Sequence, residues 1–469
     1  MVSSESVPFS KSGGLADVVG ALSGALSSLG EVLVLLPHYG FMKDELTQTT
    51  ITHTVSLLGS AEEVTYAKTT KDGVEYYFLQ HPFFADSTGI YGPTSSSAYE
   101  NNHLRYTLQS KAALELLKIL GWKADIIHAH DWTAGFLPYL LKQDSSRFFK
   151  ETRSVFSIHN LAYQGEFSRL DLLATDIDAD MRFFVGSGPT KRANMLKCGL
   201  EFADALSTVS PTYAKEIQTP FYGADLEGVL ARRQSFLSGI INGIDTQEWN
   251  PQTDQHITRN YTWRSPKRKE ENKVALQGEL GLAPDPSIPM LGMVTRLARQ
   301  KGLDLIAHVL GEILELNLQI VVLGTSEAQF EQMFKHFATT HPEKVSANIR
   351  FENVLAHKIY AASDLFLMPS LFEPCGLGQL IAMRYGSLPI VRETGGLKDT
   401  VTPYNKETDE GLGFSFANYN AHELLFTIQR AVHLYETDKE GAWKRMVGRA
   451  MRADFSWEQS AKKYKELYE

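Results

Sequence analysis

Short apolar runs, each closed by a polar or glycine turn, recur along the whole chain, and helical patterns lie between many of them. A brief continuous apolar run of this kind is typical of a strand buried on both faces of a parallel sheet. Helical spacing is visible over 104–120 and 303–316. Alternating strands and helices imply right-handed crossovers and doubly wound α/β sheets. The predicted strands are 32–36, 125–129, 154–158, 205–209, 289–294, 318–323, 364–368 and 388–391.

The chain has 469 residues, which is too long for one ordinary hydrophobic core and favours at least two domains. Residues 250–287 are rich in Pro, Lys, Arg, Asn and Asp, and the strand pattern restarts near 289. We therefore predict two Rossmann-like domains, 1–243 and 244–455. The final segment, 456–469, is expected to be a helix, for which packing back on the N-terminal domain is one option.

Composition and charge exclude several classes of protein. The formal net charge of -9 argues against nonspecific nucleic-acid binding, although a local cationic site for a small anion is compatible with it. Two cysteines in this length do not make a disulfide framework. We see no apolar run long enough to span a bilayer and no signal at the N-terminus. These features predict a cytoplasmic protein, or a stromal one if it comes from a plastid, with no nucleic-acid or membrane partner.

A Gly-Gly-Leu-x-Asp-x-Val core occurs twice, at 13–19 and at 395–401. A glycine turn that leads into a helix exposes backbone N–H groups beside the positive end of the helix dipole, which suits a phosphate. Lys11 precedes the first copy. Each copy alone could be no more than a tight turn, but the pair on two α/β halves favours one shared anionic ligand.

Two cations, Arg296 and Lys301, follow the predicted strand that ends at residue 294. Ligands of doubly wound sheets bind beyond the carboxyl ends of the strands, and a guanidinium and an ammonium suit phosphate oxygens there. The alternative is an ordinary solvated loop. Glu373 follows another strand at the same edge, where a carboxylate can accept hydrogen bonds from sugar hydroxyls. Cys375 beside it is expected to be a packing residue rather than a nucleophile.

Histidines end two further strands. The segment 128–131 reads His-Ala-His-Asp, and His159 with Asn160 ends the next strand. A metal site is one interpretation, but the absence of a further convincing ligand cluster favours sugar- or ribose-binding side chains. Asn242 lies in a turn at the predicted domain junction.

Together, the motifs resemble those of the bacterial and plant-type glycogen and starch synthases, glycosyltransferase family 5, in the same order and over essentially the whole chain. The matching segments are Lys11–Leu15, His128–Trp132, His159–Gly165, Ser210–Tyr213, Asn242–Asp245, Arg296 with Lys301, Glu373–Leu377 and Thr394–Gly396.

The resemblance implies the GT-B fold, in which two Rossmann-like domains face each other across a cleft. The N-terminal domain would hold the acceptor and the C-terminal domain the nucleotide-sugar donor. It also implies a retaining transfer of glucose from ADP-glucose to the non-reducing 4-OH of an α-1,4-glucan, with no cofactor and no catalytic metal. A related transferase that uses UDP-glucose or a small acceptor, and a catalytically weak glucan-binding homologue, are the alternatives. Oligomeric state is not predicted.

By the same resemblance, His159, Glu373, Arg296 and Lys301 would be catalytic. The implied substrate-binding residues are Lys11, Gly13, Gly14, Asp17, Tyr99, Asn102, Asp131, Asn160, Asn242, Cys375, Gly376, Leu377, Thr394, Gly395 and Gly396. One departure stands out. The family has a hydrophobic strand before this point, whereas only residues 1–3 precede Ser4 and Glu5. The first strand of the N-terminal sheet is therefore expected to be missing or nearly so, which would weaken that domain.

Overall fold

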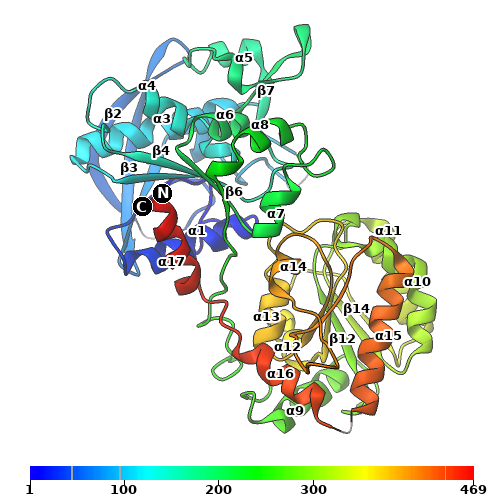
Figure 1. The fold of residues 1–469 in the computed structure, drawn as a ribbon. Coiled ribbons are helices and arrows are strands. Elements are labelled where there is room, and N and C mark those ends of the chain that lie inside the picture. Colours follow the sequence, from blue (N-terminus) through cyan, green and yellow to red (C-terminus); the bar gives the residue numbers. More distant parts are fainter. Residues whose placement is uncertain (44–45, 95–96, 439) are drawn as a thin grey trace. The chain divides into compact units, whose positions relative to one another are not determined.

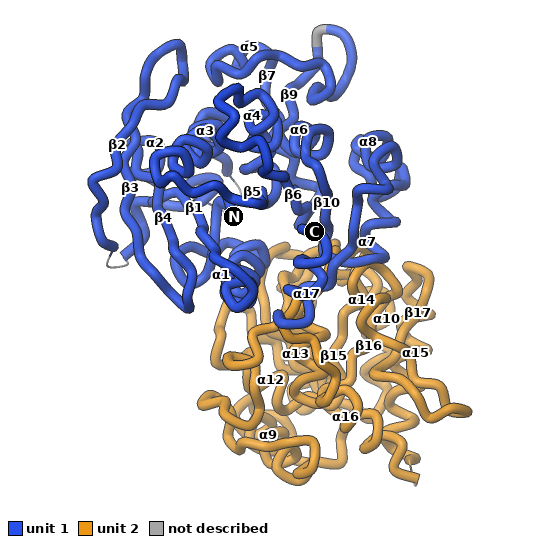
Figure 2. Tube along the Cα trace, turned by 60° about the vertical axis from the view of Figure 1, so that its left-hand side comes forward, with its two compact units in different colours: residues 1–242, 457–469 blue, residues 243–456 orange. Residues whose placement is uncertain are grey.

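The computed structural model describes residues 1–43, 46–94, 97–438 and 440–469. The chain forms two compact units, coloured separately in Figure 2, and each is built around its own sheet. Unit 1 comprises Met1–Asn242 and Trp457–Glu469, and unit 2 comprises Gly243–Ser456. No helix among the described residues is long and apolar enough to cross a membrane.

The sheet of unit 1 has two halves. One half has the order β1(Leu33–Pro37), β4(Val74–Gln80), β3(Ser60–Lys71), β2(Thr47–Leu57), and the other has the order β11(Leu237–Gly239), β10(Ala205–Thr208), β6(Arg153–Ile158), β5(Ile126–His130). The predicted strands β5, β6 and β10 pair in parallel, and β11, which was not predicted, pairs in parallel with β10. Strand β4 pairs in parallel with β1, whereas the pairs β2–β3 and β3–β4 are antiparallel. Strand β2 was missed because it is mostly exposed and polar, so it lacks the apolar run by which buried strands were recognised. Strand β4 is mostly buried and does carry an apolar run, which the sequence analysis overlooked.

Residues 1–3 lie between these two halves. Val2 forms a parallel bridge to Leu35 on β1 and another to Ala129 on β5. Its N–H donates to the His128 carbonyl at 2.9 Å, and its carbonyl accepts from the His130 N–H at 3.1 Å. The expectation of a missing first strand is thus corrected in part. A short extended segment can bond along both edges, so these residues occupy the central position despite their brevity.

Helices cover the sheet of unit 1. They include α1(Gly14–Ser27), α3(Asn102–Leu120), α4(Leu137–Gln143), α6(Met195–Phe202), α7(Pro211–Glu216) and α8(Glu227–Arg232) (Figure 1). The shorter α2(Pro82–Ala85) and α5(Arg169–Leu173) lie in connections, and a small sheet orders β7(Glu166–Ser168), β9(Arg192–Asn194) and β8(Phe184–Val185). The C-terminal helix α17(Trp457–Tyr468) packs on α1, where Trp457, Ala461 and Tyr464 contact Val18, Leu22 and Leu26.

Unit 2 contains one fully parallel sheet. Its order is β14(Val345–Asn348), β13(Gln319–Leu323), β12(Met290–Val294), β15(Leu365–Met368), β16(Leu388–Arg392), β17(Phe414–Phe416). Its helices are α9(Pro266–Glu279), α10(Leu303–Glu315), α11(Ala328–Thr340), α12(Asn353–Ala362), α13(Gly378–Arg384), α14(Gly395–Thr400), α15(Ala421–Thr437) and α16(Ala442–Arg452). The predicted strands and helices of this half are confirmed.

The polar stretch before residue 289 is part of unit 2 and contains α9, which the sequence pattern did not reveal. This helix packs on α12. Its Lys273 is buried and donates to Asp364 Oδ2 at 2.7 Å and to the Tyr435 hydroxyl at 2.8 Å. A charged side chain thus takes a core position because its partners come from distant segments, and such a pairing is not visible in local periodicity.

Candidate functional site

The strand order of unit 2 fixes where its ligand site should lie. Chain order runs outward from β12 through β13 to β14 and then returns to β15 on the other side of β12. In open α/β sheets, ligands bind beyond the carboxyl ends of the strands at this switch point. The loops that follow β12 and β15 carry three of the four predicted catalytic residues, Arg296, Lys301 and Glu373.

Lys301 and Glu373 meet at this point. The Lys301 ammonium lies 2.6 Å from Glu373 Oε2, and the side chains are 16% and 9% exposed. The hydroxyl of Ser370 donates to the same oxygen at 3.1 Å. Each charge is therefore compensated within the protein. In a ligand that has both anionic oxygens and hydroxyl groups, the anionic oxygens could take the place of Glu373 beside Lys301, and the hydroxyl groups could take the place of Lys301 beside Glu373.

Arg296 is not part of this ion pair. Its side chain is exposed, and Nη2 donates to Gln300 Oε1 at 3.0 Å. The two cations thus share a loop but differ in their surroundings, since Lys301 is half-buried. The exposed guanidinium keeps its donors accessible to an incoming anion.

Hydrogen bonds join the loops after β12 and β15 to each other and to the end of β16. The N–H of Leu371 donates to the Gln300 carbonyl at 2.9 Å. The buried guanidinium of Arg392, at the end of β16, donates to the Ser370 carbonyl at 2.8 Å and also to the carbonyl of Leu371. These bonds hold the segment that leads into Glu373 from both sides.

The second glycine pair, Gly395 and Gly396, lies against the backbone of Glu373. Gly395 has φ +44°, and a Cβ there would lie 1.9 Å from the Glu373 carbonyl oxygen. The N–H of Gly396 donates to the carbonyls of Glu373 and Pro374 at 3.2 and 3.1 Å. These glycines therefore allow two protein backbones to approach each other, and the Gly396 N–H that was predicted for a ligand already has protein acceptors.

The other predicted residues of this region lie around the two loops. Cys375 is buried, and its carbonyl accepts from Gln379 Nε2 at 3.1 Å. Gly376 has φ +75°. Leu377 immediately precedes α13, and the buried Thr394 immediately precedes α14.

The first glycine pair has a different environment. A Cβ at Gly13 or Gly14 would have no atom within 4 Å, so this backbone faces open space. The Gly13 N–H donates to Glu5 Oε2 at 3.2 Å, and the Ser12 hydroxyl and Tyr91 hydroxyl donate to Oε1 at 3.0 and 2.9 Å. The carboxylate of Glu5 therefore accepts hydrogen bonds at the start of α1.

Glu5 was not among the predicted site residues, nor was Tyr91. Burial raises the pKa of Glu5, while the hydrogen bonds from Ser12, Tyr91 and Gly13 act in the opposite direction. Glu5 follows the segment 1–3, and a carboxylate directly after a central strand was the signal that could have identified it. Lys11 projects outward and pairs with Asp17 at 2.7 Å, with 53% and 31% of the side chains exposed.

The loops after β5 and β6 bring Asp131 and His159 together. Asp131 has φ +57°, and its Oδ1 accepts from the His159 N–H at 2.8 Å. Burial raises the pKa of Asp131 to about 7, although backbone N–H groups of His159 and Asn160 oppose this. The side chain of Asn160 accepts from the Ala162 N–H at 3.1 Å, which shapes the loop that follows.

His159 also contacts a second histidine, since its Nε2 lies 3.0 Å from His130 Nδ1. Burial lowers the pKa of His159 to about 3 and that of His130 well below its usual range, so both rings are neutral. One proton therefore lies between them. His130 Nε2 and His159 Nδ1 lack partners among the described residues. Both of these nitrogens are buried from solvent.

His128 points elsewhere. Its Nδ1 lies 2.8 Å from the Tyr468 hydroxyl of α17, and its Nε2 lies 2.6 Å from Ser157 Oγ. Within the described ranges, no group of three or more His, Cys, Asp or Glu side chains is arranged to hold a metal ion.

Of the remaining predicted residues of unit 1, Tyr99 and Asn102 have structural partners. The Tyr99 hydroxyl accepts from the Thr88 N–H at 3.1 Å. Asn102 donates to the Tyr91 carbonyl at 2.8 Å and accepts from Arg105 at 2.7 Å. Both thus support the segment that carries Tyr91. Asn242 is buried at the end of unit 1, and its Oδ1 has no hydrogen-bond partner in the described structure.

Phe351 was missed by the sequence analysis. It follows β14 at the carboxyl edge of the unit 2 sheet, and 92% of it is exposed. β14 is short and was not recognised as a strand, which hid the position of the ring. An exposed aromatic face at the ligand edge of a sheet is suited to stacking on a planar ring such as a base.

The chain is similar to known proteins over its whole length. Residues 1–232 match the starch synthase catalytic domain model, and residues 282–442 match the glycosyl transferases group 1 model. The glycogen synthase of Alkaliphilus metalliredigens is 44% identical over 478 residues, which cover 99% of this chain and 98% of the relative. The glycogen synthase of Clostridioides difficile is 45% identical over 481 residues, which cover 100% and 98%.

The chain belongs to the family of bacterial and plant-type glycogen and starch synthases. It is an enzyme, a glycosyltransferase of glycogen or starch synthesis.

Solved structures of this family and of a more distant transferase support the fold. The catalytic domain of starch synthase IV from Arabidopsis thaliana, bound to ADP and acarbose, matches with TM-score 0.88 and 36% identity, over 100% of this chain and 97% of that one. Sucrose-phosphate synthase from Thermosynechococcus elongatus matches with TM-score 0.61 and 17% identity, over 100% and 98%, which shows a common fold only. The predicted GT-B class is confirmed.

Proposed function

We propose that this glycogen or starch synthase homologue transfers glucose from ADP-glucose to the non-reducing 4-OH of an α-1,4-glucan, with retention of the anomeric configuration. The observation that carries the proposal is the Lys301–Glu373 pair, in which Nζ lies 2.6 Å from Oε2 at the switch point of unit 2. It offers a cation for a diphosphate and a carboxylate for sugar hydroxyls within one small region. The related starch synthase IV is bound to ADP and acarbose, a combination of the expected nucleotide product with a saccharide.

The donor's charge can be matched by residues of this chain. We assign Lys301 and the exposed Arg296 to the diphosphate, since charge develops there as the bond to glucose breaks and fixed cations stabilise it. Glu373 accepts hydrogen bonds from glucose hydroxyls once Lys301 turns to the diphosphate. Phe351 stacks on the adenine. Lys11 of unit 1 adds a cation that can leave Asp17 for the donor.

Unit 1 supplies the groups for the sugar. We assign the His159 side chain to a hydroxyl of the transferred glucose, with Asp131 holding the backbone of His159 in place. The bond between glucose C1 and the diphosphate oxygen breaks, and a bond from C1 to the acceptor O4 forms on the same face. The proton of the acceptor hydroxyl goes to the departing diphosphate. The bacterial relatives support a cytoplasmic location.

Transfer of label tests this proposal. The protein is incubated with glycogen and ADP-glucose labelled in the sugar, and the product is then digested with β-amylase, which releases maltose from non-reducing ends of α-1,4-glucans. We expect labelled maltose. Label that enters the polymer but resists this enzyme would contradict the assigned linkage, and labelled free glucose alone would contradict transfer to a glucan.

The role of Phe351 has a separate test. Phe351→Ala should raise the KM for ADP-glucose about tenfold through loss of one stacking contact, whereas Phe351→Tyr should retain wild-type KM. Phe426, 58% exposed on α15, provides the matched control as Phe426→Ala. An unchanged donor KM in Phe351→Ala would remove this residue from the nucleotide site.

A further inference from the structure

Two aromatic rings in unit 1 that the proposed mechanism does not use are exposed. Tyr163 is 58% exposed and lies four residues after His159, in the loop that follows β6. Phe221 is 74% exposed and lies beyond α7, in the connection that follows β10. Strands β6 and β10 are parallel neighbours, so both segments begin at the same edge of the sheet.

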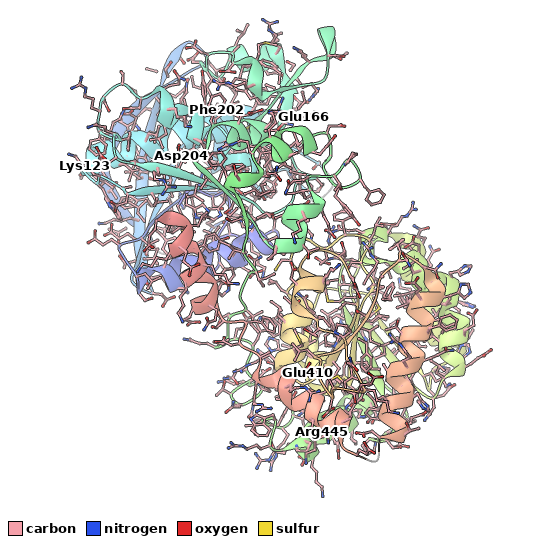
Figure 3. All side chains as sticks on the ribbon, in the orientation of Figure 1. Lys123, Glu166, Phe202, Asp204, Glu410 and Arg445 are labelled. Carbon is pink, nitrogen blue, oxygen red and sulfur yellow. The ribbon has the colours of Figure 1, made fainter. Side chains whose placement is uncertain are left out.

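The loop that carries Tyr163 is held at several points. The Leu161 N–H donates to the hydroxyl of the buried Tyr213 at 3.2 Å. Asn194 donates to Gln164 Oε1 at 2.6 Å. Strand β7 begins two residues after Gln164, at Glu166, which Figure 3 labels. Gly165 has φ +62°, and a Cβ there would lie 2.3 Å from the Trp132 ring. Because its neighbours are fixed, the loop keeps the Tyr163 ring at the surface.

The segment with Phe221 is attached to that loop. Gln164 Nε2 donates to the Ala224 carbonyl at 2.8 Å. A turn closed by the Gly223 N–H on the Thr219 carbonyl, at 2.8 Å, precedes this contact. The Phe221 ring packs edge-on against Tyr222, with centroids 4.7 Å apart. Two neighbouring exposed aromatic segments are unlike the isolated apolar side chains that are normal on protein surfaces.

The charges around these rings restrict what can bind. Asp225 is exposed and Glu227 lies two residues further along, while the exposed Glu166 pairs with Arg192 Nε at 3.3 Å. Carboxylates repel a diphosphate or a nucleic acid but accept hydrogen bonds from hydroxyl groups. The C–H groups on the face of a pyranose ring pack on the electron-rich face of an aromatic ring. A neutral polyhydroxylated chain therefore fits both features.

We propose that Tyr163 and Phe221 form a binding surface for the acceptor glucan, separate from the donor-binding groups. This inference rests on the proposed function, since the glucan is its acceptor. Successive glucose rings of the chain pack on the two aromatic side chains, and their hydroxyls donate to the neighbouring carboxylates. The surface thereby lowers the acceptor concentration that transfer requires without acting on the donor.

The test separates acceptor from donor kinetics in the full-length chain. Tyr163→Ala and Phe221→Ala should each raise the KM for maltoheptaose about tenfold, as for loss of one aromatic contact, with the KM for ADP-glucose unchanged. Tyr163→Phe should retain the wild-type value because it keeps the ring. The matched control is Phe236→Ala, which removes a ring that is 50% exposed elsewhere in unit 1.

Direct binding completes the test. Calorimetric titration with maltoheptaose, without donor, should show weaker binding in both alanine variants while their melting temperatures stay at the wild-type value. Wild-type acceptor affinity in both variants, or a parallel rise in the ADP-glucose KM, would overturn this inference alone. A wild-type protein that transfers glucose from no donor would instead overturn the proposed function.

Discussion

Lys301 and Glu373 neutralise each other across two loops of unit 2, with Nζ 2.6 Å from Oε2. Both side chains are largely buried, so each charge depends on the other for compensation. The pair is suited to exchange, because a nucleotide sugar offers an anion to the lysine and hydroxyls to the carboxylate. The unliganded site thereby avoids an uncompensated buried charge.

Glu373→Gln should lower kcat for glucose transfer about a hundredfold or more, the usual cost of losing one group that stabilises a transition state. The side chain keeps its size but loses its charge. Lys301→Met should have an effect of similar size, since it leaves the carboxylate unpaired and the diphosphate without its cation. Steady-state kinetics with ADP-glucose and glycogen measure both. Wild-type kcat in either variant would remove that residue from the reaction.

Lys11→Ala should raise the KM for ADP-glucose and lower kcat/KM about tenfold or more, because a cation assigned to the diphosphate is lost. The partner Asp17 then has no counter-ion, but it is exposed enough to remain hydrated. The exposed Lys71 at the end of β3 serves as the control in Lys71→Ala. Equal kinetics in the two variants would show that Lys11 does not contact the donor.

The two glycine pairs should differ in their tolerance of a side chain. Gly14→Ala should change the free energy of unfolding by no more than about 1 kcal/mol, since the added methyl group meets open space in a helix. Gly395→Ala should lower the free energy of unfolding by more than about 1–2 kcal/mol, because the alanine would be strained in a left-handed backbone and would clash with the Glu373 carbonyl. Urea unfolding measures both changes. Equal losses of unfolding free energy in the two variants would contradict the different surroundings of Gly14 and Gly395.

Acid should destabilise unit 1 through its buried histidines. Burial lowers the pKa of His128, His130 and His159 below the ordinary value of 6.5, to about 3 for His159. The unfolded chain therefore binds more protons below about pH 6.5, and the free energy of unfolding falls as pH falls. Asp131 and Glu5, whose pKa values are raised, oppose this trend.

A difference between variants isolates the histidine contribution. His128→Asn should reduce the fall in the free energy of unfolding between pH 7 and pH 5.5. The reduction should be up to about 1.4 kcal/mol per pH unit, the linkage value for one proton. The exposed His422 on α15 gives the control in His422→Asn, which should keep the wild-type slope. Denaturant unfolding at several pH values measures these slopes, and identical slopes in all three proteins would contradict a neutral buried His128.

Buried strands could be predicted from sequence because an apolar run such as 318–323 records burial on both faces locally. The motif order likewise placed Lys301 and Glu373 at strand ends, where the structure joins them. The near-identical glycine loops show the limit of such prediction. Gly13 faces open space and Gly395 packs on Glu373, and this difference depends on partners far away in the chain. Tyr163 was read only as part of a family motif, since exposure is a property of the folded surface.

Nucleotide release with glycogen present, compared between ADP-glucose and UDP-glucose, tests the central claim most directly. The account predicts faster release of ADP, dependent on glycogen and matched by glucose entering the polymer. Preferential release of UDP would contradict the assigned donor. Absence of release from both donors, by a protein shown to be folded, would contradict the proposed transfer itself.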